Sequence, residues 1–182
     1  FFVYIVRYAV LDWGPTLLGE WKGVSIHHAG WMVAAFEISG IVGMLVAGWA
    51  TDRFFGGRGP RVCVICMALA TVFVALFWGI SQPPMWLATL LLGAAGFCIY
   101  GPQALVGIAA ANIATKKAAA TAVGFTGLFG YASTLVSGWG LGLLAQHYGW
   151  NIAVGALILI AIMGTLIFMA AWSAKANGYD ND

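Results

Sequence analysis

The sequence has 182 residues, of which 62% are hydrophobic and only 8% are charged, and its mean hydropathy is +0.92. Soluble domains carry about 25% charged residues, so this composition excludes a soluble enzyme, a nucleic-acid-binding protein and a disordered segment. The net charge of +2 comes without a basic run and therefore indicates no nucleic-acid partner. The composition predicts an integral membrane protein whose surroundings are the lipid bilayer.

Apolar stretches divide the chain into segments that are long enough to cross a bilayer, for which a helix needs about 20 residues. These segments lack the alternation of apolar and polar residues that is typical of barrel strands, so helices are favoured. The predicted fold is an all-α membrane protein with six transmembrane helices. The expected spans are residues 1–20, 29–50, 62–81, 85–109, 121–145 and 150–173.

The basic residues are distributed unequally between the two sides of the predicted membrane. One side carries Lys22, while Arg7 lies within a span. Six others fall on the side that both ends of the chain share: Arg53, Arg58, Arg61, Lys116, Lys117 and Lys175. Loops rich in Lys and Arg remain in the cytoplasm, so we expect both ends of the chain to be cytoplasmic.

Two spans contain an aromatic residue followed by Gly-Pro. The first span has it at residues 13–15 and the fourth at residues 100–102, which are corresponding places in two sets of three helices. Paired interruptions of this kind indicate an inverted-repeat transporter and its substrate site. Two independent proline kinks are the alternative, because membrane helices tolerate them. We therefore expect two three-helix inverted repeats.

Three charged residues lie within predicted spans, where a charge at the bilayer centre costs about 2.5–3.5 kcal/mol. Arg7 either binds an anion through its planar guanidinium or forms a structural ion pair with Glu37. Asp12 lies about 140° around the helix from Arg7 and so cannot be its simple same-face partner. For Asp12 and Glu37, ion pairs that hold or gate the helices are favoured, because carboxylates repel anionic substrates.

Polar aromatic residues and histidines give weaker signals. The hydroxyls of Tyr100 and Tyr131 need hydrogen-bond partners within the membrane, which phosphate oxygens would supply, although packing alone also explains such residues. No catalytic Ser/His or Asp/Asp set is evident, so no enzyme is predicted. We expect no cofactor and no metal site, because three histidines lack carboxylate or Cys companions: His27, His28 and His147.

One segment, residues 2–15 with Arg7 and Asp12, resembles the seventh helix of the organophosphate:phosphate antiporters of the major facilitator superfamily. The similarity continues in order and at consistent spacing over nearly the whole chain, through residues 36–40, 47–53, 100–107 and 116–131. The chain thus resembles the carboxy-terminal six-helix half of a twelve-helix transporter, one half of the major facilitator fold. The amino-terminal half of such a protein is absent from this sequence.

The resemblance implies a substrate site midway between two six-helix halves, with one arginine from each half gripping the phosphate. Arg7 matches the arginine of the carboxy-terminal half. Tyr4, Tyr100 and Tyr131 match aromatic positions that line the cavity. These four residues are the predicted substrate-binding set.

The loop after the second span resembles the acidic–basic motif that braces the cytoplasmic gate in this family. The matching residues are Asp52, Arg53 and Arg58. Two positions depart from the family pattern: Asn112 stands where many members have an acidic residue, and Ala120 replaces a common Gly. Both bear on gating rather than on phosphate binding.

The function implied is exchange of an organophosphate for inorganic phosphate by alternating access in the bacterial inner membrane. Residues 7–22 are most like glycerol-3-phosphate transporters, which makes glycerol 3-phosphate the expected substrate. Residues 56–60 and 101–103 look equally like hexose-phosphate members. A hexose-phosphate transporter, or a membrane sensor of hexose phosphate, is therefore the alternative.

Overall fold

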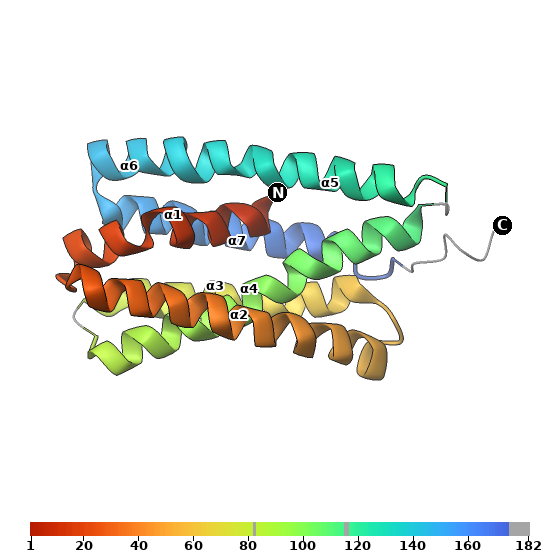
Figure 1. Ribbon diagram of the computed structural model, residues 1–182, viewed down its shortest axis with the longest axis horizontal. Coiled ribbons are helices and arrows are strands. Elements are labelled where there is room, and N and C mark those ends of the chain that lie inside the picture. Colours follow the sequence, from red (N-terminus) through yellow and green to blue (C-terminus); the bar gives the residue numbers. More distant parts are fainter. Residues whose placement is uncertain (82, 115–116, 175–182) are drawn as a thin grey trace.

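The computed structural model describes residues 1–81, 83–114 and 117–174, and these residues form a bundle of helices without strands (Figure 1). The prediction of an all-α fold is confirmed for this part of the chain. The helices are α1 (Phe2–Lys22), α2 (Ile26–Phe55), α3 (Gly59–Gly79), α4 (Met85–Ile113), α5 (Ala119–Thr134), the π-helical turn η1 (Leu135–Gly140), α6 (Leu141–Tyr148) and α7 (Trp150–Ala170).

Five helical segments are long and apolar enough to cross a membrane: α2, α3, α4, α7 and the continuous rod of α5, η1 and α6. Helix α1 has 21 residues but carries Arg7, Asp12, Glu20 and Lys22, and it does not meet the same apolar criterion. A membrane protein with five apolar helices is therefore established. Six spans and two inverted repeats remain predictions.

The basic loops lie at one end of the bundle. The α2–α3 turn, the end of α4, the start of α5 and the end of α7 share this end, while the α1–α2 and α6–α7 connections, the end of α3 and the start of α4 share the other (Figure 1). Lys116 and Lys175 lie outside the described residues, but Arg53, Arg58, Arg61 and Lys117 belong to the first end. The N-terminus lies near the middle of the long axis (Figure 1), so α1 begins about halfway along the bundle.

Glycines end the first two helices. Gly23 and Gly56 adopt left-handed backbone angles, with φ of 67° and 56°, and their amides bond back to carbonyls of the last turn. Only glycine adopts this conformation without strain from a Cβ atom. Helix α2 consequently continues to Phe55, past the predicted limit at residue 50, and α4 likewise continues past residue 109 to Ile113.

Small residues bring α2 and α4 into close contact. A Cβ atom added to Gly43 would collide with the backbone carbonyl of Phe97, and one added to Gly96 would collide with the carbonyl of Phe36. Packing of this kind is typical of membrane helices, which associate through close backbone approach rather than through the hydrophobic effect. The contact fixes the depth and rotation of α4 beside α2.

The expected interruptions at the two Gly-Pro sequences do not break the helices. Pro15 lies inside α1 and Pro102 inside α4, and both helices continue through them. A proline removes one backbone donor, and neighbouring helices in a membrane protein compensate for that loss. The change of helical geometry occurs instead in η1, where no interruption was predicted.

Candidate functional site

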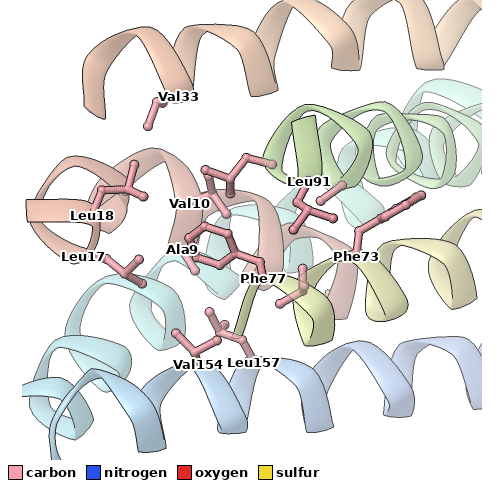
Figure 2. Close-up of a pocket in the computed structure, with 14 residues that line it drawn as sticks. Ala9, Val10, Leu17, Leu18, Val33, Phe73, Phe77, Leu91, Val154 and Leu157 are labelled. Atoms are coloured by element: carbon pink, nitrogen blue, oxygen red, sulfur yellow. The ribbon is translucent and has the colours of Figure 1, made fainter. Parts of the chain in front are cut away.

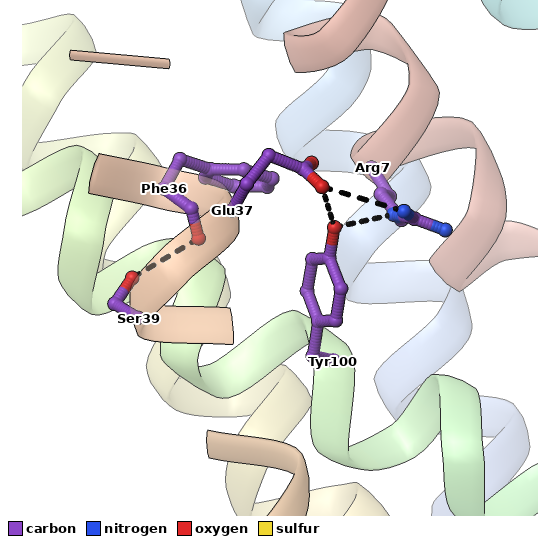
Figure 3. A network of polar contacts seen from close by, with 5 residues as sticks. All are labelled: Arg7, Phe36, Glu37, Ser39 and Tyr100. Atoms are coloured by element: carbon purple, nitrogen blue, oxygen red, sulfur yellow. Dashed lines mark hydrogen bonds and ion pairs between the residues drawn. The ribbon is translucent and has the colours of Figure 1, made fainter. Parts of the chain in front are cut away.

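Arg7 lies on α1 and reaches across to α2 and α4 (Figure 3). Its Nε atom donates to the Tyr100 hydroxyl at 2.9 Å, and its Nη2 atom lies 3.5 Å from Oε2 of Glu37. The Tyr100 hydroxyl in turn donates to the same Oε2 atom. Three helices thus place one cation, one anion and one hydroxyl within hydrogen-bond reach of one another.

The surroundings of this cluster explain why the charges are paired. The side chains of Arg7 and Glu37 are 18% and 31% exposed, and the guanidinium carbon also lies 4.5 Å from the centroid of the Tyr100 ring. A buried charge without a partner is costly, and a cation over an aromatic face gains further stabilisation. The arrangement therefore holds a charge inside the bundle without leaving it uncompensated.

The cluster retains unused hydrogen-bonding capacity. A guanidinium has five N–H donors, and the contacts within the described part of the chain engage those of Nε and Nη2. Oε1 of Glu37 is buried and has no hydrogen-bond partner among the described residues. Arg7 can accordingly offer a second edge of its planar group to an anion while it remains in contact with Tyr100.

A glycine and a phenylalanine one turn apart on α2 orient the Tyr100 ring. Gly40 leaves the space that the ring occupies, since any Cβ atom there would overlap it. Phe36 contacts the ring edge-to-face, with centroids 6.2 Å apart. Ser39 ties the two helices together, because its hydroxyl lies 2.7 Å from the carbonyl of Gly93 and 3.0 Å from that of Phe36 (Figure 3 draws the latter contact).

Tyr4 and Tyr131 lie beside the cluster rather than in it. The Tyr4 ring stacks on that of Tyr8 with a centroid separation of 6.1 Å, and Tyr8 lies 5.5 Å from the guanidinium carbon of Arg7. The Tyr4 ring also covers Gly130 of α5, where an added Cβ would lie 3.2 Å from the ring. Tyr131 is 71% exposed, on the surface next to this contact.

The other predicted site residues lie elsewhere. Asp12 is exposed on α1, and within the described ranges it forms no ion pair. Asp52 lines a cavity of about 170 Å³ between α2, α3 and α4, together with Asn112. Arg53 and Arg58 make no ion pair with Asp52 in the part that the structure covers. The gating role of these residues remains a prediction.

The interior also contains a small apolar cavity of about 40 Å³, between the end of α1 and helices α2, α3, α4 and α7 (Figure 2). Its lining includes Val10, Leu18, Phe77 and Leu91 and offers no charged side chain. Such a cavity cannot compensate the charge of an anion. The polar cluster around Arg7 is therefore the better candidate for a binding site.

Sequence reasoning identified Arg7, Glu37 and Tyr100 separately and also weighed the Arg7–Glu37 ion pair, which the structure contains. It missed Tyr8 and the supporting role of Gly40. The spacing of four residues between Tyr4 and Tyr8 is a usable signal, because such residues are neighbours on a helix. The contact between Gly40 and Tyr100 gives no such signal, since it joins two helices.

Comparison with known proteins now identifies the family. Residues 1–178 match the Major Facilitator Superfamily. The chain belongs to this superfamily. It is 40% identical over 175 residues to a probable hexose phosphate transport protein of Chlamydia pneumoniae, an alignment that covers 96% of this chain and 38% of the relative.

Two further relatives show the range of names within this group. A glycerol-3-phosphate transporter of Haemophilus influenzae is 35% identical over 195 residues, covering 96% of this chain and 41% of the relative. The membrane sensor protein UhpC of Salmonella typhimurium is 34% identical over 175 residues, covering 96% and 39%. The chain thus spans about two fifths of the length of these superfamily members, which are named as transporters or as a sensor and not as enzymes.

Proposed function

We propose that this chain forms the carboxy-terminal half of a secondary transporter that exchanges an organophosphate for inorganic phosphate. The observation that carries the proposal is the Arg7 cluster, in which a charged guanidinium deep in the bundle keeps donors for an anion. Arg suits this task because its fork of donors matches phosphate geometry. Relatives named as glycerol-3-phosphate and hexose phosphate transporters support the same substrate class.

The complete transporter, in this proposal, consists of twelve spans in the bacterial inner membrane with both ends of this chain in the cytoplasm. Helix α1 joins the five apolar segments as a span of this half. One inverted repeat comprises α1, α2 and α3, and the other comprises α4, the rod of α5, η1 and α6, and α7. The amino-terminal half supplies the second arginine. Basic loops gathered at one end of the bundle support the orientation.

Binding proceeds by exchange of anions on Arg7. In the empty site Glu37 neutralises the guanidinium, and the Tyr100 hydroxyl bridges the two groups. An arriving phosphate takes over the positive charge, and Glu37 is released from it. Glu37 compensates only one of the two facing arginines, so without a bound anion the site keeps a net positive charge, which favours movement of the loaded site over the empty one. Exchange follows, and no bond of the substrate is broken.

The organic part of the substrate has two candidates. The sequence around Arg7 resembles glycerol-3-phosphate transporters, and on this basis glycerol 3-phosphate is the preferred substrate. The second candidate is hexose phosphate, which the identities of 39–42% to three chlamydial proteins named as probable hexose phosphate transport proteins favour. Competition between the two compounds for labelled phosphate uptake separates these candidates. A sensor would bind hexose phosphate without flux.

The decisive experiment replaces Arg7 in the complete transporter, purified in detergent for binding and reconstituted for flux. Arg7→Lys keeps the charge and loses the planar fork, so phosphate affinity should fall about tenfold or more, since a charge-assisted hydrogen bond is worth about 1.5–3 kcal/mol. Arg61→Lys, at the end of the bundle and away from the cluster, is the matched control and should bind normally.

A second variant distinguishes binding from structure. If Arg7 serves only its ion pair with Glu37, then Arg7→Gln combined with Glu37→Gln removes both charges and should restore function. The proposal requires the opposite result, loss of phosphate binding by a folded protein. Near-normal binding by either the Lys variant or the double variant would overturn it.

A further inference from the structure

The turn η1 interrupts the long rod made by α5 and α6. At its end, the amide of Leu141 donates to the carbonyl of Val136, five residues earlier, instead of four as in an α-helix. A π-helical turn holds one more residue than an α-helical turn, and one residue corresponds to about 100° of rotation. The residues of α5 and α6 therefore face directions that an uninterrupted α-helix of the same sequence would not give.

Trp13 of α1 contacts this turn through both parts of its indole. Its Nε1–H donates to the carbonyl oxygens of Ser137 and Gly138, both within η1 and both 3.0 Å away. Its six-membered ring covers Gly142 of α6, where an added Cβ would lie only 2.6 Å away. The indole also contacts Trp150, with centroids 5.9 Å apart.

The same helix α1 also holds the rod on the far side of the turn. Tyr4, nine residues before Trp13, covers Gly130 of α5. Both rings lie against a glycine: an added Cβ would be tight at Gly130 and would collide with the indole at Gly142, so each contact depends on the rotation of its helix. In this structure both contacts are made with η1 in the π-helical form.

We propose that Trp13 is a positioning residue, whose indole N–H holds η1 in the π-helical form and so sets which residues of α5 face Tyr4 and Arg7. An N–H donor that serves two backbone carbonyls stabilises a turn whose own hydrogen bonds are irregular. The consequence for substrate binding rests on the proposed function. The effect on the helix does not, and it is measurable without substrate.

The test follows the rotation of α5 by labelling one introduced thiol. Ser133 lies in the last turn of α5 and is fully buried, so the complete protein carries Ser133→Cys after all its native cysteines, Cys63, Cys66 and Cys98 among them, are changed to Ala. A water-soluble maleimide should label the thiol at position 133 slowly. Trp13→Phe removes the N–H donor, and labelling should become about fivefold to tenfold faster, as expected for the loss of one net hydrogen bond.

Trp139→Phe is the matched control, because the same change is made in η1 itself at a side chain that is 74% exposed. It should leave the labelling rate at the parent value. Equal rates for Trp13→Phe and Trp139→Phe would overturn the proposal.

A deletion separates positioning from simple packing. Removal of Val136 takes the extra residue out of η1. A regular α-helix of the shortened sequence then presents the same faces of α5 and α6 as the parent does with its π-helical turn. Combined with Trp13→Phe, the deletion should therefore return labelling at position 133 to the slow rate, and it should restore membrane levels if Trp13→Phe alone accumulates poorly. A double variant that is labelled fast or remains poorly folded would overturn the proposal. Absent phosphate binding with this labelling pattern intact would contradict only the proposed function.

Discussion

At the scale of single residues, Arg7 has two partners with different consequences for an incoming anion. The Tyr100 hydroxyl orients the guanidinium and can remain in place, since it carries no charge. The Glu37 carboxylate, whose Oε2 lies 3.5 Å from Nη2 of Arg7, competes with the anion for the same positive charge. Glu37 therefore stabilises the charge of Arg7 when no anion is bound, and it lowers the affinity of the site for an anion.

Glu37→Gln should accordingly strengthen phosphate binding while it slows exchange. The substitution removes a competing charge whose interaction with Arg7, in a partly exposed pair, is worth up to about 1 kcal/mol, so affinity should rise about two- to fivefold. Turnover should fall, because no carboxylate then competes with the bound phosphate for Arg7 and release of the phosphate becomes slower. Equilibrium binding and counterflow of labelled phosphate measure the two effects, and weaker binding by a folded variant would contradict this account.

The sequence predicted the chemical types in this cluster but not their geometry. Arg7 and Glu37 are conspicuous because charges are rare in spans, and their pairing was one of two interpretations. The direction of Tyr100 depends on how α4 rotates against α2, which is decided by contacts between glycines and backbone far apart in the chain. Such contacts leave no periodic pattern in the sequence.

At the scale of helices, the α2–α4 contact supports the site. Gly40, Gly43 and Gly96 allow the two backbones to approach, and the position of the Tyr100 ring follows from that approach. A larger side chain in this contact has no flexible neighbour to displace, because the opposing atoms at Gly43 belong to the backbone of Phe97. The two helices would have to move apart.

Gly43→Ala should therefore destabilise the protein by about 1–3 kcal/mol, the usual range for overpacking. Gly30→Ala is the control on the same helix, since Gly30 is exposed with open space at its Cβ position. It should be neutral or slightly stabilising, because alanine favours helices over glycine. Thermal unfolding in detergent measures both variants, and equal midpoints would argue against a tight contact.

Helix existence was predictable for most of the chain because long apolar runs leave little choice of structure in a bilayer. The internal geometry was not. Two proline-containing segments were expected to interrupt helices and do not, whereas η1 lies in a segment with no proline. Prolines mark where a backbone donor is missing, but the contact between Trp13 and η1 depends on a tertiary neighbour.

At the scale of the whole molecule, the face around Arg7 forms only part of the proposed site. The chain spans about two fifths of the relatives it matches, and the second arginine belongs to the proposed amino-terminal half. In this half alone, Glu37 already balances the charge of Arg7, so there is no excess positive charge for a bound substrate to neutralise. Alternating access also requires a second body against which this bundle moves.

The 182 residues alone should therefore give no exchange when reconstituted into vesicles loaded with phosphate. Counterflow of labelled phosphate at the background rate of empty vesicles is the expected result. Co-reconstitution with the amino-terminal half as a separate chain is the matching positive experiment, and it should restore exchange. Robust counterflow by this chain alone would contradict the two-half site.

The polar character of α1 has a consequence for how the protein is made. Helices α2, α3, α4 and α7 are apolar enough to enter the bilayer by themselves, but α1 is not, since each central charge opposes insertion by about 2.5–3.5 kcal/mol. Among the described residues, Glu37 of α2 is the carboxylate that pairs with Arg7. In the proposed topology with α1 as a span, we expect the translocon to retain α1 until α2 has been synthesised, so that the two segments partition into lipid as a pair. The ion pair at the proposed binding site would then also serve membrane insertion of α1.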